Sequence, residues 1–137
     1  MPGMKVFVAI RVPRDNPAAE HLVAVVGEVL RSSGNIAFVA YQEIARRGLS
    51  PAQFMPYVRE EISTSNIVLV VYSPDLRGGL IELGIAFALG VPVWLAVRKG
   101  ERVSTSALAC ATQVIEYATL QELESGLRIA INGGTSS

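Results

Sequence analysis

The sequence predicts an α/β protein: a three-layer α/β/α sandwich around a five-stranded parallel sheet of the flavodoxin-like order 2-1-3-4-5. Short apolar segments rich in β-branched residues alternate along the chain with longer segments whose apolar residues have helical spacing. The apolar segments lack polar alternation, which is typical of strands buried on both faces of a parallel sheet. Such an alternation requires right-handed crossovers, and a chain of 137 residues with five strands forms this sandwich most economically.

Five segments are predicted as strands. The first four are continuous apolar runs bounded by polar or turn-forming residues, and the fifth is shorter. They are residues 6–10, 36–41, 67–72, 91–97 and 114–115.

The first helix is predicted to begin after Asn16 as its N-cap, with Pro17 as the first helical residue. Apolar residues then recur at helical spacing on one face: Leu22, Val25, Val26, Val29 and Leu30. Gly34 ends this helix.

The second and third helices also have explicit signals. Residues 50–53, Ser-Pro-Ala-Gln, form a capping box with proline at the first helical position. The predicted apolar face of this helix consists of Phe54, Met55, Val58 and Ile62. The third helix is predicted over residues 79–89, with Gly90 as its left-handed cap.

The last helix begins at a second capping box, Thr-Leu-Gln-Glu at residues 119–122. The chain ends in Gly-Gly-Thr-Ser-Ser, a composition that favours disorder. We therefore expect one domain over residues 1–132 and a disordered tail over residues 133–137.

Composition excludes several classes of protein. Twelve Lys and Arg residues balance twelve Asp and Glu residues, so no overall field favours nucleic acid or an anionic membrane. The N-terminus has no signal-peptide pattern, and no apolar run approaches the roughly 18 residues of a membrane span, so we expect a cytoplasmic protein. The single cysteine, Cys110, excludes a disulfide framework and indicates a reducing compartment.

The predicted topology also predicts where a ligand binds. In a sheet of this order, ligands bind beyond the carboxyl ends of the strands, between the first and the third strand. The residues there are 11–15 and 73–82. Arg11 and Arg14 could hold a phosphate or lie in solvent beside Asp15, and we favour phosphate because of this position. Tyr41, after the second strand, could stack on a base or cap the core.

Residues 73–84 carry most of the chemistry. Gly78 and Gly79 allow a ligand to approach the backbone closely, at a helix start whose N–H groups favour an anion. Glu82 follows near the start of the helix, where the helix dipole favours its ionised form, and an ionised carboxylate can act as a nucleophile. From spacing alone, a helix-start glutamate after an ordinary turn explains the pattern equally well. A buried helix face of Ile81, Leu83, Ile85 and Phe87 around the glutamate favours the functional interpretation.

Residues 66–86, NIVLVVYSPDLRGGLIELGIA, resemble the signature of the nucleoside 2-deoxyribosyltransferase superfamily, in which a buried strand, a glycine loop and Glu-x-Gly-x-Ala follow in order. Within that superfamily the chain is most similar to the 2'-deoxynucleoside 5'-monophosphate N-glycosidases. Residues 7–11, FVAIR, resemble their Gly-Ser-Ile-Arg turn with one residue missing, and residues 101–107, ERVSTSA, resemble their Gly-Arg-Val-x-Ser-Ala segment.

The resemblance implies the fold predicted above and hydrolysis of the N-glycosidic bond of a nucleotide. It implies that Glu82 attacks the anomeric carbon, and that Arg11 and the Gly78-Gly79 turn hold the 5'-phosphate. Ile10 and Ser73 are further candidate binding residues, Ser73 as the hydroxyl nearest to the family's phosphate-binding serine. It also implies a homodimer, in which Ser104, Thr105 and Ser106 reach the phosphate in the neighbouring subunit's site. No metal or organic cofactor is implied, and His21 has no partner at metal-ligand spacing.

Glycosidic cleavage of this kind uses two carboxyl groups in different protonation states. Asp75 is the second carboxyl that we expect beside Glu82. It lies on the preceding loop and not on the same helix, so helical periodicity does not decide whether the two share a pocket.

The chain departs from the family pattern at three positions. Val58 stands where the family has an aspartate, Leu76 where it has a phosphate-binding serine, and Leu80 where it has a second glycine. Glu60 or Glu61 could replace the missing aspartate only if the helix register shifts. These departures leave open a ribonucleotide, modified nucleotide or nucleoside substrate. Two alternative functions also stay open: a nucleoside deoxyribosyltransferase, and a nucleotide sensor of the same fold without turnover.

Two other proteins of related architecture fit less well. A response-regulator receiver domain needs an acidic pair after its first strand to bind magnesium, and this chain has Arg-Val-Pro there. A Rossmann dinucleotide enzyme needs G-x-G-x-x-G after the first strand, and this pattern is absent.

Overall fold

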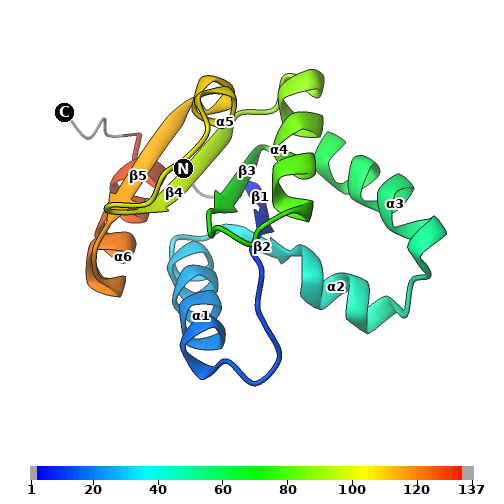
Figure 1. The fold of residues 1–137 in the computed structure, drawn as a ribbon, viewed down its shortest axis with the longest axis horizontal. Coiled ribbons are helices and arrows are strands. Elements are labelled where there is room, and N and C mark those ends of the chain that lie inside the picture. The colour runs from blue at the N-terminus through cyan, green and yellow to red at the C-terminus, as the bar shows by residue number, and fades with distance from the viewer. Residues whose placement is uncertain (1–2, 134–137) are drawn as a thin grey trace.

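The computed structural model of the protein describes residues 3–133, and it confirms the predicted sandwich (Figure 1). Five parallel strands form one sheet in the order β2-β1-β3-β4-β5, which is the order predicted from the sequence. The strands are β1 (Lys5–Ala9), β2 (Ile36–Val39), β3 (Ile67–Val71), β4 (Val93–Arg98) and β5 (Gln113–Tyr117).

Helices cover both faces of this sheet. Alternate strand residues such as Val6 and Leu69 pack against α1 (Pro17–Ser32) and α6 (Leu120–Ile131). Their neighbours, such as Phe7 and Val68, form a second cluster with α3 (Pro51–Ser63) and α4 (Gly78–Leu89). All five residues of β3 are buried, as expected for a central strand of a parallel sheet.

Two asparagine side chains fix the start of β1. The Asn35 amide oxygen accepts a hydrogen bond from the Met4 N–H at 3.0 Å, and the Asn66 oxygen accepts one from the Lys5 N–H at 2.8 Å. Each asparagine directly precedes a strand that pairs with β1. The two side chains thus satisfy backbone donors where the sheet has no further strand residue to do so.

The predicted helix signals are confirmed where they are local. Asn16 accepts a hydrogen bond from Ala19 N–H as the N-cap of α1, and Ser50 and Gln53 form the capping box of α3. Gly90 ends α4 in the left-handed conformation, with φ of 73°. Thr119 caps α6 by accepting from the Glu122 N–H.

Two helices were not predicted: α2 (Ala40–Arg47) and α5 (Thr105–Cys110). The predicted second strand, residues 36–41, was therefore wrong at its end, because the chain turns helical at Ala40. The apolar run continues across this boundary, so the change of period leaves no signal there. The fourth strand begins later than predicted, since the Val91 N–H bonds back to the Ala86 carbonyl and Pro92 has no N–H.

Two predicted helix faces were wrong in part, although Val58, Ile62 and Leu83 are buried as predicted. Met55 on α3 is exposed, and the buried residues of that helix are Val58 and Ile62. On α4, Ile81 and Phe87 are exposed. The predicted α4 face, Ile81, Leu83, Ile85 and Phe87, alternates with a period of two, whereas the buried face has helical spacing through Leu83 and Ala86.

The last described residue, Gly133, forms a turn after α6. The rest of the predicted tail, residues 134–137, lies outside the described residues. Among residues 3–133, the helices are too short or too polar to cross a membrane.

Candidate active site

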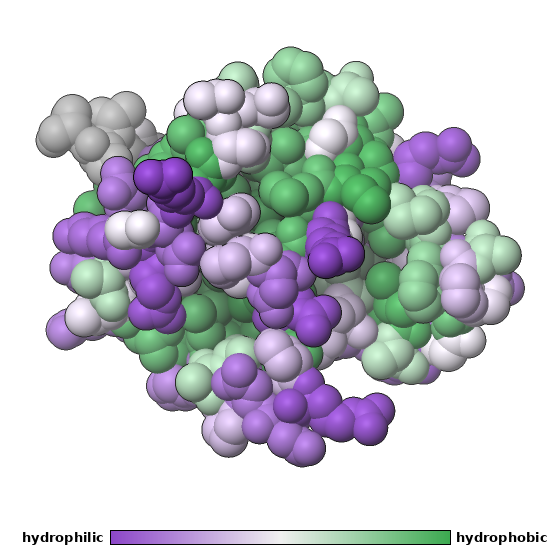
Figure 2. Space-filling view, in the orientation of Figure 1, coloured by the Kyte–Doolittle hydropathy of each residue, from purple (hydrophilic) through white to green (hydrophobic). Residues whose placement is uncertain are grey.

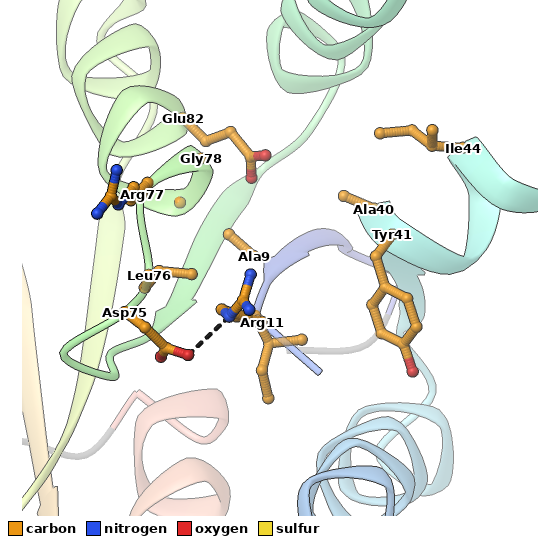
Figure 3. A pocket seen from close by; sticks show the side chains of 12 residues that line it. Ala9, Arg11, Ala40, Tyr41, Ile44, Asp75, Leu76, Arg77, Gly78 and Glu82 are labelled. Carbon is orange, nitrogen blue, oxygen red and sulfur yellow. Dashed lines mark hydrogen bonds and ion pairs between the residues drawn. The ribbon is translucent and has the colours of Figure 1, made fainter. Parts of the chain in front are cut away.

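A cavity of about 470 Å³ opens at the carboxyl end of β1, where the sequence places a ligand (Figure 3). Its walls come from the end of β1, from the loop after β3, from the start of α4 and from α2. The lining residues are Ala9, Ile10, Arg11, Ala40, Tyr41, Ile44, Asp75, Leu76, Arg77, Gly78, Gly79 and Glu82.

Glu82 is the carboxyl group that reaches into this cavity from α4. Its Oε2 atom is buried and has no hydrogen-bond partner among the described residues. Figure 3 shows the carboxyl group facing open space, with Ala40 and Ile44 of α2 on the opposite side. Burial in these apolar surroundings raises the pKa of Glu82 to about 7.

The expected ionisation of Glu82 by the helix dipole is therefore not what the structure shows. Glu82 is the fifth residue of α4, beyond the first turn in which the dipole acts strongly. Desolvation outweighs the dipole here, so the carboxyl group is about half protonated at neutral pH.

The pKa of Asp75 is shifted in the opposite direction from that of Glu82. Its Oδ2 atom accepts a hydrogen bond from Arg11 Nε at 2.6 Å, and its Oδ1 atom accepts one from the Ser73 hydroxyl at 2.9 Å. Both contacts lower the pKa of Asp75, and the hydrogen bond from Ser73 has the larger effect. The pair is about half exposed, so solvent screens its Coulomb energy.

The cavity thus holds both carboxyl groups that were expected, with pKa values moved apart. Asp75 is turned toward Arg11, and no hydrogen bond joins it to Glu82 (Figure 3). The Arg11 Nη groups have no partner among residues 3–133, so they remain free to donate to a ligand.

The two glycines differ in what surrounds them. Both are helical residues at the start of α4, and neither has a positive φ. A Cβ atom at Gly79 would lie 2.7 Å from the buried Leu76 side chain, whereas one at Gly78 would meet nothing within 4 Å. Gly79 therefore makes room for Leu76, and Gly78 leaves the backbone open toward the cavity.

The other predicted binding residues are divided between the cavity and its surroundings. Ile10 lines the cavity, whereas Arg14 is exposed on the loop and does not. Ser73 does not line it either, and it contributes through Asp75. Ser104, the N-cap of α5, and the adjacent Thr105 and Ser106 are exposed and lie outside this cavity.

The residues at the departures from the family pattern do not restore the missing groups. Val58 is buried in the core, and Leu80 is exposed on α4. Glu60 is exposed and does not line the cavity, and Glu61 forms an ion pair with Lys5. No carboxylate from α3 therefore lines this cavity.

Sequence reasoning missed the residues that α2 contributes. Ala40 and Ile44 became part of the site only because residues 40–47 form a helix. Tyr41 packs against the core and also lines the cavity; stacking on a base stays a prediction. Arg77 was also missed, although its guanidinium points away from Glu82 (Figure 3).

Among residues 3–133, no group of three His, Cys, Asp or Glu side chains is placed to hold a metal ion.

Solved structures of similar fold include three with informative names. The chain is similar to the CMP N-glycosidase BcmB of Clostridium botulinum, with a TM-score of 0.75 and 18% identity over 92% of this chain and 98% of BcmB. It is similar to BlsM, with a TM-score of 0.75 and 18% identity over 97% of this chain and 93% of BlsM. It is similar to a 2-deoxyribosyltransferase of Bacillus psychrosaccharolyticus, with a TM-score of 0.66 and 21% identity over 88% and 90%.

These likenesses confirm the fold that the sequence resemblance implied. No family model and no curated protein sequence matches the chain.

The two glycines give a matched pair of variants. We expect Gly79→Ala to lower the free energy of unfolding by about 1–3 kcal/mol, because the new methyl group overlaps Leu76. We expect Gly78→Ala to be neutral or to stabilise the protein by up to about 1 kcal/mol, since alanine is the better helix former and has room. Urea unfolding of both variants tests this, and equal stability of the two would contradict it.

Replacing the buried carboxyl group has a pH-dependent effect on stability. The pKa of Glu82 is raised in the folded protein, so the protonated form is favoured by folding, and this contribution is lost as pH rises from about 4.5 to 7. We expect Glu82→Gln to gain about 3 kcal/mol of stability relative to wild type over that range. Unfolding of both proteins at pH 4.5 and pH 8 measures this difference, and a constant difference would show that Glu82 titrates normally.

Proposed function

We propose that this protein hydrolyses the N-glycosidic bond of a nucleoside 5'-monophosphate, with a deoxynucleotide favoured, and releases the free base and the sugar phosphate. The observation that carries the proposal is the buried, unpartnered carboxyl group of Glu82 in a cavity that also contains Arg11. The names of the similar structures support the proposal, since they include a CMP N-glycosidase and a 2-deoxyribosyltransferase.

Glu82 supplies the nucleophile in this scheme. Its carboxylate forms a bond to the anomeric carbon while the bond to the base nitrogen breaks, and the electron pair leaves with the base, which takes up a proton. Water then attacks the same carbon, loses a proton, and releases Glu82 as a carboxylate. The absence of hydrogen bonds to Oε2 keeps this oxygen reactive.

Asp75 has a different role from a proton donor. Its lowered pKa keeps it ionised at neutral pH, so it provides a negative charge near the positive charge that develops on the sugar. It also fixes the position of Arg11. The proposed reaction therefore still uses two carboxyl groups, of which Glu82 forms the bond to the anomeric carbon.

The 5'-phosphate is placed against Arg11 and the start of α4. The Arg11 Nη groups are free, and the N–H groups of Gly78 and Gly79 precede the first intrahelical bonds of α4. An open backbone at Gly78 allows the phosphate to approach closely. The family's phosphate-binding serine is replaced by the buried Leu76, so these groups act without it.

We further propose that the protein is a homodimer and that α4 forms the interface. Figure 2 shows a continuous apolar surface over α4. Exposed apolar side chains of α4 include Ile81 and Phe87, at 55% and 59% exposure, together with Leu80 and Leu89, and α5 exposes Leu108. Helices of soluble monomers rarely expose so much apolar surface, whereas a second copy would bury it.

The dimer would also complete the site. Ser104, Thr105 and Ser106 begin α5, which packs against α4 at the edge of this apolar surface. They line neither their own cavity nor the core, so their hydroxyl groups are available to a phosphate in the partner subunit's site. This arrangement agrees with what the sequence resemblance implies.

The function is tested by incubating the protein with ribo- and deoxyribonucleoside monophosphates and with nucleosides. Chromatography measures the free base that is released. We expect wild type to release base, and Glu82→Gln to release less than a thousandth as much, because an amide does not replace a carboxylate nucleophile. We expect kcat/KM of the wild type to rise with pH and to level off above about 7, since the ionised form attacks.

The matched control is Glu116→Gln, an exposed carboxylate on β5 that lines neither the cavity nor the core. Base release that survives in Glu82→Gln would remove Glu82 from the mechanism. A pH profile that falls through 7 would instead assign the protonated Glu82 as the active form.

The dimer is tested by light scattering of purified protein. We expect twice the chain mass of 14.6 kDa for wild type and a monomer for Phe87→Asp, because the variant buries a charge at the interface. Ile129→Asp is the control, since Ile129 is similarly exposed but lies on α6. A monomeric wild type would refute the interface.

A further inference from the structure

A second cavity of about 340 Å³ adjoins the first one. It lies at the carboxyl ends of β3, β4 and β5, and the first turns of α1 form its other side. The two cavities share Ile10, Arg11 and Asp75. The ion pair between Arg11 and Asp75 therefore separates the two cavities. Ser73, which donates to Asp75, lines the second cavity.

Polar groups of this second cavity lack partners in the protein. The hydroxyl groups of Tyr72 and Tyr117, the guanidinium of Arg98 and the carboxylate of Glu101 make no hydrogen bond or ion pair with residues 3–133. The Arg98 guanidinium lies 5.2 Å from the centre of the Tyr117 ring. The Glu101 N–H donates to the Arg98 carbonyl at 3.1 Å, so a tight turn brings the two charged side chains to the same end of the cavity.

The charges of Arg98 and Glu101 both act on Tyr117. Burial raises the pKa of Tyr117, Arg98 lowers it and Glu101 raises it, so the hydroxyl stays protonated and can donate. Of the remaining lining, Leu22, Val71 and the alanines of α1 are apolar, whereas Asn16, Ser73 and the Arg11–Asp75 pair are polar and already make hydrogen bonds. The cavity thus combines apolar surface with unpaired donors and one unpaired carboxylate.

This set of groups selects a chemical class of ligand. A free guanidinium donates to carbonyl or ring-nitrogen acceptors, and a free carboxylate accepts from amino or ring N–H groups. A phosphate would satisfy Arg98 but would be repelled by the unpaired carboxylate of Glu101. At Arg11 this repulsion is smaller, because both oxygens of the neighbouring Asp75 already accept hydrogen bonds, from Arg11 and Ser73. A nucleobase offers donors and acceptors along one edge and apolar faces for the walls, so it matches both charges.

We propose that the second cavity is a nucleobase subsite, and that the substrate is a dinucleotide whose two nucleosides are joined through phosphate held at Arg11. This inference rests on the proposed function, because it takes the cleaved nucleoside to lie in the first cavity, beside Glu82. A 5'-phosphate on Arg11 then lies at the wall that both cavities share. A group attached beyond that phosphate enters the second cavity.

The test compares CMP with the symmetric dinucleotide P1,P2-dicytidine 5'-diphosphate, by calorimetric Kd and by cytosine release. Symmetry removes the question of which base enters which cavity. We expect the dinucleotide to bind wild type at least tenfold more tightly than CMP. We expect Arg98→Gln and Glu101→Gln each to reduce the ratio of the two Kd values about tenfold. Arg102→Gln, an exposed neighbour that lines neither cavity, serves as the control and leaves the ratio unchanged.

The outcomes separate this inference from the proposed function. Cytosine release from CMP with equal Kd values for the two ligands would overturn the subsite and leave the N-glycosidase standing. An Arg98-dependent preference for the dinucleotide, with no base released from any ribo- or deoxyribonucleoside monophosphate or nucleoside of the panel above, would support the subsite and refute the hydrolase. Arg98-dependent binding of added cytidine to CMP-saturated protein, with no preference for the dinucleotide, would overturn the covalent link between the two bases.

Discussion

The reversal of strand order at β1 is the constraint on which the rest of the structure depends. β1 pairs with β2 on one side and with β3 on the other, so the connections that leave these strands diverge to opposite faces of the sheet. The gap between them holds both cavities, and the ion pair between Arg11 and Asp75 spans it. The loops that carry these two residues follow β1 and β3 directly, so the sheet itself fixes their separation.

The electrostatics of the site follow from this geometry. The same gap leaves Asp75 near solvent and beside a cation, while α2 and α4 enclose Glu82 in apolar surroundings. Two carboxyl groups on one short segment therefore differ in protonation without any metal or cofactor having to be invoked. Burying Glu82 without a hydrogen bond is unfavourable for folding, and a site with a chemical task is where such a group is expected.

The sequence predicts most of the fold because its signals are local. The caps at Asn16, Ser50, Gly90 and Thr119 act within one helical turn, and the continuous apolar runs identify strands buried on both faces. Residues 36–41 were misassigned because the strand and the following helix share one apolar run. The buried face of α4 was misassigned because that helix is apolar nearly all round, so composition does not tell which side meets the sheet.

The failure to predict α2 also limited what could be predicted about the site. Glu82 and Asp75 were identified as a pair, but the state of Glu82 depends on Ala40 and Ile44, which belong to the helix that was missed. A pKa reflects neighbours from distant parts of the chain, and no spacing within residues 73–84 contains that information. The pairing of Asp75 with Arg11, 64 residues away in sequence, is likewise a tertiary property.

The two asparagines at the start of β1 have a consequence for how the protein is assembled. β1 is synthesised before the other four strands, but Asn35 and Asn66, whose side chains accept from the Met4 and Lys5 N–H groups, follow those residues by 31 and 61 positions. Every residue up to Val71 must therefore leave the exit tunnel before β1 has both of its neighbouring strands. Until then its unpaired backbone N–H and C=O groups and its apolar side chains are open to other chains, so the interval before β3 emerges is when a nascent chain of this protein most needs a chaperone.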